Sequence, residues 1–178
     1  MILHYFRDKE NKDQKISDII YLNIIKKTRN ICDETFDNNK KDFNLVFEIS
    51  SILLIVVFMG LNRNSNFNST SLKDGLISLF IKDLDYSLRY EGVSDIKIGK
   101  LVKLYVKKFY YRIPLIEEIF KTKKPDLLIS YLEKFQIITN NQAKKNINML
   151  SFFHYLEGLV YEIEKIKKIE KLNIKLLK

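Results

Sequence analysis

The sequence contains few residues of the kinds that form tight turns, disulfides or metal sites. It has five glycines, two prolines, one cysteine, two histidines and no tryptophan among 178 residues. So few glycines and prolines leave little material for hairpins and tight β-turns. They also exclude a phosphate-binding glycine loop, and no GxGxxG, P-loop, GxSxG or HExxH motif occurs. The sequence therefore favours an all-α fold without nucleotide chemistry.

Cysteine and histidine are too sparse for a disulfide or a metal centre. Cys32 is the only cysteine, so no intramolecular disulfide can form and no oxidising compartment is indicated. His4 and His154 stand near opposite ends of the chain without neighbours at ligand spacing. His154 lies in the aromatic run SFFHYLEG and is expected in the interior or at an interface. We expect no metal, no cofactor, no small-molecule substrate and no catalytic residue, and hence a protein that is not an enzyme.

Basic residues outnumber acidic ones. Lysine and arginine number 31 against 22 aspartates and glutamates, which gives a formal net charge of +9. Such a charge favours anionic partners, for example ribosomal RNA or acidic lipid headgroups. A solvated lysine-rich surface explains it equally well. Charge alone therefore names no partner.

The first 15 residues lack the features of a targeting segment. Met1 to Lys15 mixes charges of both signs, without the apolar run of a signal peptide or the acid-poor character of a transit peptide. We expect a cytoplasmic protein of the bacterial type, with peripheral attachment to the inner membrane as the alternative.

One apolar stretch approaches the length of a membrane span. Leu45 to Leu61 covers 17 residues, but Glu48 and the pair Ser50-Ser51 interrupt its first half. An ionised glutamate inside lipid costs a few kcal/mol. We predict that this stretch is the buried central helix of a bundle.

Helical spacing of apolar residues covers most of the chain. We predict a single-domain bundle, with residues 1–120 as its core and residues 121–178 as a helical extension packed on the same domain. Two polar stretches, Asn30 to Lys41 and Asn62 to Ser71, are expected to be surface segments. The predicted helices are Gln14 to Lys27, Asp42 to about Gly60, Leu72 to Leu88, Ser94 or Asp95 to Pro114, Leu115 to Phe120, Pro125 to Phe135, and a long one from Gln142 to about Leu177.

Several residues match the rules for helix ends. Asp42 can cap the central apolar helix, and Ser71 with Asp74 has the spacing of a capping box. Gly92 is predicted in the left-handed conformation that ends a helix, with Val93 packing back on it. Pro114 is expected to kink or end its helix.

Aromatic and basic side chains are dense between positions 97 and 112. Tyrosines placed among cations are common in surfaces that bind other chains, although core packing explains rings at helical spacing equally well. We predict a partner-binding patch with Lys100 and Arg112 toward the partner. Its residues are Lys100, Tyr105, Phe109, Tyr110 and Arg112.

The segment from Phe80 to Arg112 resembles the signature of the ubiquinol-cytochrome c chaperone family. The matching pattern is F, D-x-D-x-S-L-R, G-V-x-D, G-K and F-Y-x-R. It places structural roles on Phe80, Asp83, Asp85, Arg89, Gly92, Asp95 and Gly99. Asp85 and Arg89 are four residues apart and are expected to pair along one helix face.

The resemblance is weaker outside this segment. Family members usually show a Gly-Arg-Phe-Asp-like entry into the apolar helix, where this chain has Lys41-Asp42-Phe43-Asn44. They also tend to have a histidine within that helix, and this chain has none between Asp42 and Gly60. Beyond about Phe120 the chain shows no resemblance to the family.

The resemblance implies a function as well as a fold. It implies an all-helical factor that assists assembly of the ubiquinol-cytochrome c reductase complex, respiratory complex III, and binds an apolar client such as cytochrome b. Mitochondrial members contact newly made cytochrome b and the ribosome. The alternative, from another class, is a basic helical protein that binds RNA or the ribosome.

Overall fold

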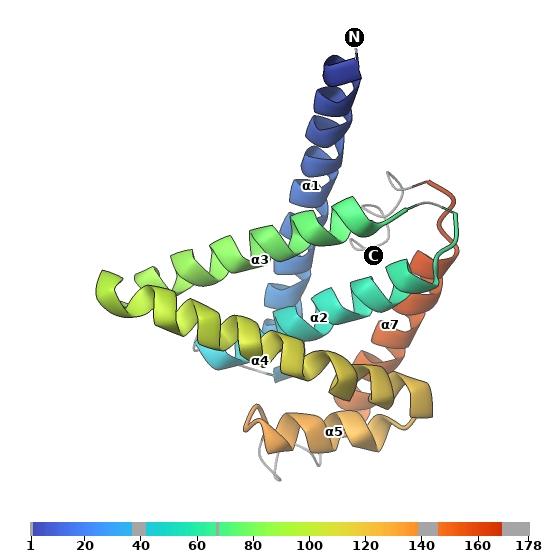
Figure 1. Cartoon of the computed structure of the whole chain (residues 1–178). Helices are drawn as coiled ribbons and strands as arrows, with labels where there is room; N and C mark the ends of the chain where they lie inside the picture. The colour runs from blue at the N-terminus through green and yellow to red at the C-terminus, as the bar shows by residue number, and fades with distance from the viewer. Residues whose placement is uncertain (1, 37–41, 67, 139–145, 169–178) are drawn as a thin grey trace.

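A computed structural model describes the chain over residues 2–36, 42–66, 68–138 and 146–168. These residues contain α-helices and no β-strand, which confirms the predicted all-α fold (Figure 1). The helices are α1 (Ile2–Phe36), α2 (Phe43–Arg63), α3 (Thr70–Tyr90), α4 (Asp95–Thr122), α5 (Pro125–Lys134) and α7 (Asn146–Glu164).

Helix α2 is the centre of the bundle and packs against α1, α4 and α7. Its side chains from Phe47 to Leu61 are all buried. By length and composition it could cross a membrane, yet 83% of its most apolar 18-residue stretch is buried inside the protein. The prediction of a buried central helix is therefore confirmed. Asp42 caps it as expected, because its side chain accepts a hydrogen bond of 2.9 Å from the Asn44 N–H.

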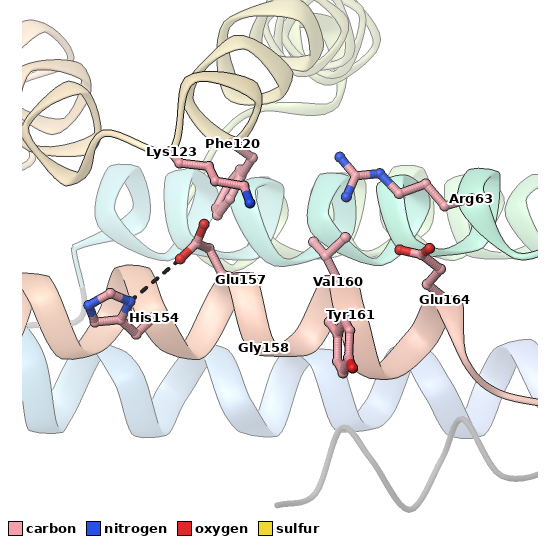
Figure 2. A pocket seen from close by; sticks show the side chains of 9 residues that line it. All are labelled: Arg63, Phe120, Lys123, His154, Glu157, Gly158, Val160, Tyr161 and Glu164. Carbon is pink, nitrogen blue, oxygen red and sulfur yellow. Dashed lines mark ion pairs between the residues drawn. The ribbon is translucent and has the colours of Figure 1, made fainter.

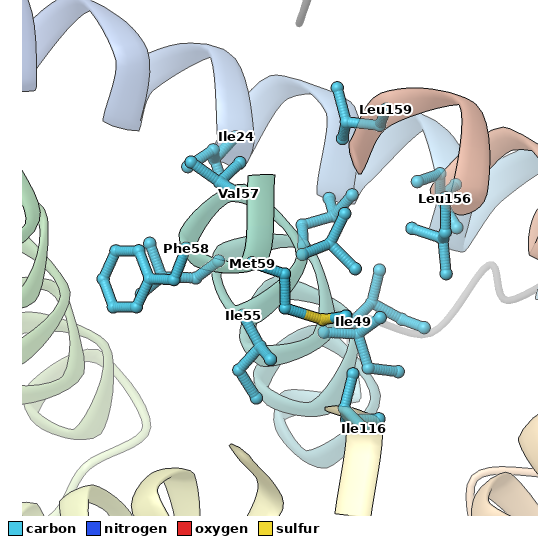
Figure 3. Packing of buried hydrophobic residues seen from close by; sticks show 14 of the residues in the cluster. Ile24, Ile49, Ile55, Val57, Phe58, Met59, Ile116, Leu156 and Leu159 are labelled. Atoms are coloured by element: carbon cyan, nitrogen blue, oxygen red, sulfur yellow. The ribbon is translucent and has the colours of Figure 1, made fainter. Parts of the chain in front are cut away.

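A helix that is apolar all round needs a neighbour on every side. Figure 3 shows how the neighbours of α2 meet this need. Ile49, Ile55, Val57, Phe58 and Met59 of α2 pack among Ile24 of α1, Ile116 of α4, and Leu156 and Leu159 of α7.

The close approach of α2 and α7 depends on a glycine. A Cβ atom at Gly60 would lie 2.6 Å from the Cβ of Ile163, which is far inside van der Waals contact. Asn64 directly follows the last residue of α2. Its side-chain amide donates hydrogen bonds of 2.8 and 2.9 Å to the carbonyls of Ile163 and Ile166. Asn64 is itself buried, so the predicted loop from Asn62 to Ser71 is partly interior.

Helix α7 ends at Glu164, and the prediction of a helix to about Leu177 is wrong in its extent. Residues 165–168 are not helical, and Asn64 binds the carbonyl groups at this helix end. The predicted helix also covered residues 142–145 and 169–177, which lie outside the described residues.

Three other boundaries differ from the sequence prediction. Helix α1 continues through Asn30 to Phe36, because Ile31 and Cys32 extend the buried face. Pro114 lies inside α4 without ending it, since buried residues on both sides hold the helix against the core. The Ser71 capping box does not form. Helix α3 begins at Thr70, whose N–H is bound by the Asn68 side chain at 2.9 Å.

The turn between α3 and α4 has the predicted geometry. Gly92 has a φ of 82°, and its N–H donates to the carbonyl of Arg89, while the Val93 N–H donates to the carbonyl of Leu88. This pair of bonds is the Schellman motif, which satisfies the last carbonyls of a helix. The turn joins α3 and α4 into a hairpin whose arms diverge away from it (Figure 1).

We predict that Gly92→Val lowers the free energy of unfolding by about 1 kcal/mol or more, because a β-branched residue is strained at positive φ. No atom lies within 4 Å of a Cβ placed there, so the loss comes from the backbone and not from a clash. Gly99→Ala in α4 is the matched control, since its Cβ also meets open space. It should stabilise the protein by about 0.5–1 kcal/mol. Urea unfolding checks both, and equal effects of the two variants would contradict the left-handed cap.

Candidate functional site

A buried ion pair joins α2 to α4. Glu48 and Arg112 are both nearly inaccessible to solvent, with the Arg112 Nη2 atom 2.6 Å from the Glu48 Oε1 atom. The Tyr131 hydroxyl of α5 donates a hydrogen bond of 2.9 Å to the Glu48 Oε2 atom. The Phe135 ring, just beyond α5, covers the guanidinium at 4.0 Å. One carboxylate therefore holds groups from α4 and α5 against α2.

The tyrosine of this cluster is fixed as a hydrogen-bond donor. Burial, and then the negative charge of Glu48, raise the pKa of Tyr131 well above its usual value. The hydroxyl thus stays protonated at physiological pH and completes the shell around the buried carboxylate. Each member of the cluster compensates for the removal of the others from water.

The structure divides the predicted partner-binding residues between the interior and the surface. Phe109 is 1% exposed and Arg112 is 6% exposed, so the prediction that these two face a partner is wrong. Tyr105 is half-buried, with its ring edge-on to Phe43 and Phe47 of α2. Only Lys100 and Tyr110 of the five are exposed.

The physical reason lies in the angle between neighbouring residues on a helix. Successive residues are 100° apart, so Phe109 and Arg112 turn inward with Ile116, while Tyr110 and Tyr111 turn outward. The sequence contained a signal that could have placed Arg112 in the interior. Arg112 follows Phe109 by three residues and precedes Ile116 by four, so the three residues share the side of the helix that packs on the core.

The residues of the Phe80 to Arg112 motif mostly form the hairpin itself. Phe80 packs in the core, with its ring 4.9 Å from that of Phe109. Asp83 accepts a hydrogen bond of 2.9 Å from the Tyr21 hydroxyl and so ties α3 to α1. Burial and the Asp83 charge raise the pKa of Tyr21. Gly99 is exposed on α4 with open space where a Cβ would lie.

Arg89 links the two helices of the hairpin by ion pairs on the protein surface. It pairs with Asp85 one turn earlier in α3 at 2.6 Å, as predicted, and also with Asp95 at the start of α4. All three side chains are at least 41% exposed, so this cluster is a surface ion network. Surface pairs of this kind contribute little stability.

A groove opens where α3 and α4 diverge over α2. It encloses about 280 Å³ and is lined by apolar side chains of all three helices. Ile55 and Phe58 of α2 form part of it, with Ile77 of α3 and Ile113 of α4. The other lining residues are mostly exposed and polar: Asn62, Thr70, Lys73, Asp74, Tyr110 and Glu117. An apolar lining with a polar rim is typical of a surface that takes an apolar segment of another chain.

A second hollow lies between α7 and the ends of α2 and α4 (Figure 2). Arg63 and Lys123 stand on one side of it, and Glu157 and Glu164 of α7 on the other. His154 is exposed at its edge, 3.5 Å from Glu157. Of the two positions expected for this histidine, the interior is therefore wrong, and an interface stays a prediction.

Two further observations concern the cysteine and the possible metal ligands. Burial raises the pKa of the Cys32 thiol to about 11, which makes it a poor nucleophile near neutral pH. Within the described part of the chain no three histidine, cysteine or acidic side chains gather as metal ligands would.

These features define an all-α, single-domain protein built on a buried apolar helix and an αα-hairpin. A solved structure with this fold is that of the Cbp3 homolog from Brucella abortus. The TM-score is 0.72, with 21% sequence identity over 98% of this chain and 94% of the other. The all-helical fold that the family resemblance implied is thus confirmed. No protein-family model and no curated protein matches the chain in sequence.

We predict that Arg112→Ala lowers the free energy of unfolding by about 3–5 kcal/mol, because it leaves the Glu48 carboxylate buried without its cation. Replacing both partners by apolar residues, Glu48→Leu with Arg112→Met, should cost much less than the sum of the single changes. Urea unfolding of the four proteins of this double-mutant cycle gives the coupling. Arg89→Ala, in the exposed pair, is the control and should barely move the midpoint. Additive effects of the Glu48 and Arg112 changes would show that the pair is not coupled.

Proposed function

We propose that this protein is an assembly chaperone of the ubiquinol-cytochrome c reductase complex, respiratory complex III. Its client in this proposal is an apolar transmembrane segment, and cytochrome b is the protein that supplies it. The observation that supports the proposal most is the fold shared with the Cbp3 homolog, together with the motif from Phe80 to Arg112. The proposed role is binding and not catalysis.

The groove between α3 and α4 is the part of the surface best suited to this client. Its lining comes from three helices that the core holds rigidly, so the apolar surface is formed before the client arrives. A transmembrane helix that has not yet entered the bilayer exposes apolar side chains on every face. Apolar side chains on one face of the client helix can enter the groove, while Lys73 and Glu117 contact the polar residues that flank the client helix. This arrangement would keep the client from aggregating until it is inserted.

We predict that Ile77→Asp and Ile113→Asp each reduce capture of cytochrome b at least tenfold, because a carboxylate in the groove must lose its water when an apolar helix docks. The assay is co-purification of the tagged chain with cytochrome b made by in vitro translation. Leu22→Asp is the matched control, since Leu22 is 59% exposed on α1 away from the groove, and it should capture client normally. Melting temperatures identify any variant that loses capture by unfolding. Folded groove variants that capture cytochrome b as well as the control would contradict the docking site.

The alternative function, binding of RNA or the ribosome by a basic helical protein, rests on the net charge of +9. It predicts RNA binding with a steep dependence on salt and no defect in complex III when the gene is deleted. The chaperone proposal predicts the reverse, that complex III fails to assemble in the deletion strain.

A further inference from the structure

The outward surface of α4 has an unusual charge composition. From Ile96 to Ile116 the sequence contains five lysines and one arginine, and it contains no aspartate or glutamate. The arginine is Arg112, whose charge is balanced by Glu48 in the core. The lysines Lys97, Lys100, Lys103 and Lys107 are exposed, and Lys108 is half-buried. The acidic residues nearest to them in the sequence are Asp95, which pairs with Arg89 at the turn, and Glu117, beyond the end of this run.

Exposed apolar side chains lie among these lysines. Ile96 is 95% exposed, Leu104 is 46% exposed and Tyr111 is 54% exposed. They follow one another at intervals of eight and seven residues, which is two turns of helix and about 11–12 Å. This spacing places all three on one side of α4, opposite the buried Ile98, Phe109 and Ile116.

Three of the lysines share that side. Lys100, Lys103 and Lys107 follow Ile96 by four, seven and eleven residues, which is the spacing of a single helix face. We call this surface the outer face of α4. It consists of Ile96, Lys100, Lys103, Leu104, Lys107 and Tyr111.

We propose that the outer face of α4 binds the surface of a lipid bilayer that contains anionic headgroups. The lysine ammonium groups pair with lipid phosphates, while Ile96, Leu104 and Tyr111 enter the boundary between headgroups and acyl chains. Helices that lie in a membrane surface combine basic and apolar residues in this way, and tyrosine is enriched at that depth. Each lysine near an anionic leaflet adds attraction that salt screens.

The apolar members of the face favour lipid over the other anionic or apolar partners. RNA offers phosphates to the lysines and bases that stack on tyrosine, but it gives an aliphatic side chain such as Ile96 little to contact. A second copy of the chain would bring its own lysines against these and be repelled. A bilayer satisfies the lysines and the aliphatic side chains together.

The outer face shares no residue with the groove in which the client is proposed to dock. The α4 residues that line the groove are Tyr110, Ile113 and Glu117, and none of them is a member of the outer face. The membrane proposal therefore does not depend on the chaperone proposal. The two are tested by different variants.

We predict that the full chain co-sediments with vesicles of phosphatidylcholine and phosphatidylglycerol, and not with vesicles of phosphatidylcholine alone. Binding should weaken as salt rises. The triple variant Lys100→Gln, Lys103→Gln, Lys107→Gln should bind about 100-fold more weakly, at roughly fivefold for each lysine. The double variant Ile96→Ser, Leu104→Ser should bind about tenfold more weakly while its salt dependence stays unchanged.

Matched controls separate the outer face from the net charge of the protein. The triple variant Lys15→Gln, Lys26→Gln, Lys124→Gln removes the same charge from exposed lysines outside α4, and Leu22→Ser removes an exposed leucine of α1. Both controls should bind vesicles nearly as the unchanged chain does. Equal losses in the two lysine triples would overturn the proposal, as would full binding by folded Ile96→Ser, Leu104→Ser. Binding of an RNA oligonucleotide that depends on the outer lysines, without vesicle binding, would assign the face to RNA and also refute the proposal.

Discussion

The ion pair between Glu48 and Arg112 fixes how the rest of the helices are placed. Helix α2 is apolar on every side, so aliphatic packing alone distinguishes poorly between different rotations of this helix. A rotation that moved Glu48 away from Arg112 would leave two charges buried and unpaired, at a cost of about 3–5 kcal/mol. The same rotation would exchange most aliphatic contacts for others of similar kind. The pair thus sets the orientation of α2 and α4, and Tyr131 extends this constraint to α5.

The orientation of α4 in turn decides which residues are available to partners. Once Arg112 points to Glu48, the helical period turns Phe109 and Ile116 inward and leaves Lys100, Lys107 and Tyr111 outside. The hairpin turn at Gly92 sends α3 back at an angle to α4, so that the groove forms where the two diverge over α2. The interior charge pair and the two candidate binding surfaces are therefore parts of one arrangement.

Local rules were enough to predict the features that depend on neighbours in sequence. The burial of α2, the cap at Asp42 and the left-handed Gly92 all follow from short patterns. The residues that were misplaced depend on partners far along the chain. Arg112 meets Glu48 across 64 residues, and Asn64 meets Ile163 across 99. The spacing of Arg112 from Phe109 and Ile116 indicates an inward position, but no local pattern identifies Glu48 as its partner or Ile163 as the partner of Asn64. The run of rings and cations was therefore interpreted as a surface, although Phe109 and Arg112 are interior.

Ile96 and Leu104 are exposed although the protein covers its most apolar helix, α2, almost completely. Helix α2 would pass for a membrane span by length and composition, yet α1, α4 and α7 shield nearly all of it from water. Three positions of the outer face of α4 are already lysines, so lysine could have made the rest of it polar as well. Exposed aliphatic side chains two turns apart among those lysines contribute no burial energy to a helix that faces only water. The same side chains contribute binding energy when the helix lies on a membrane, because they then leave water for the boundary between headgroups and acyl chains.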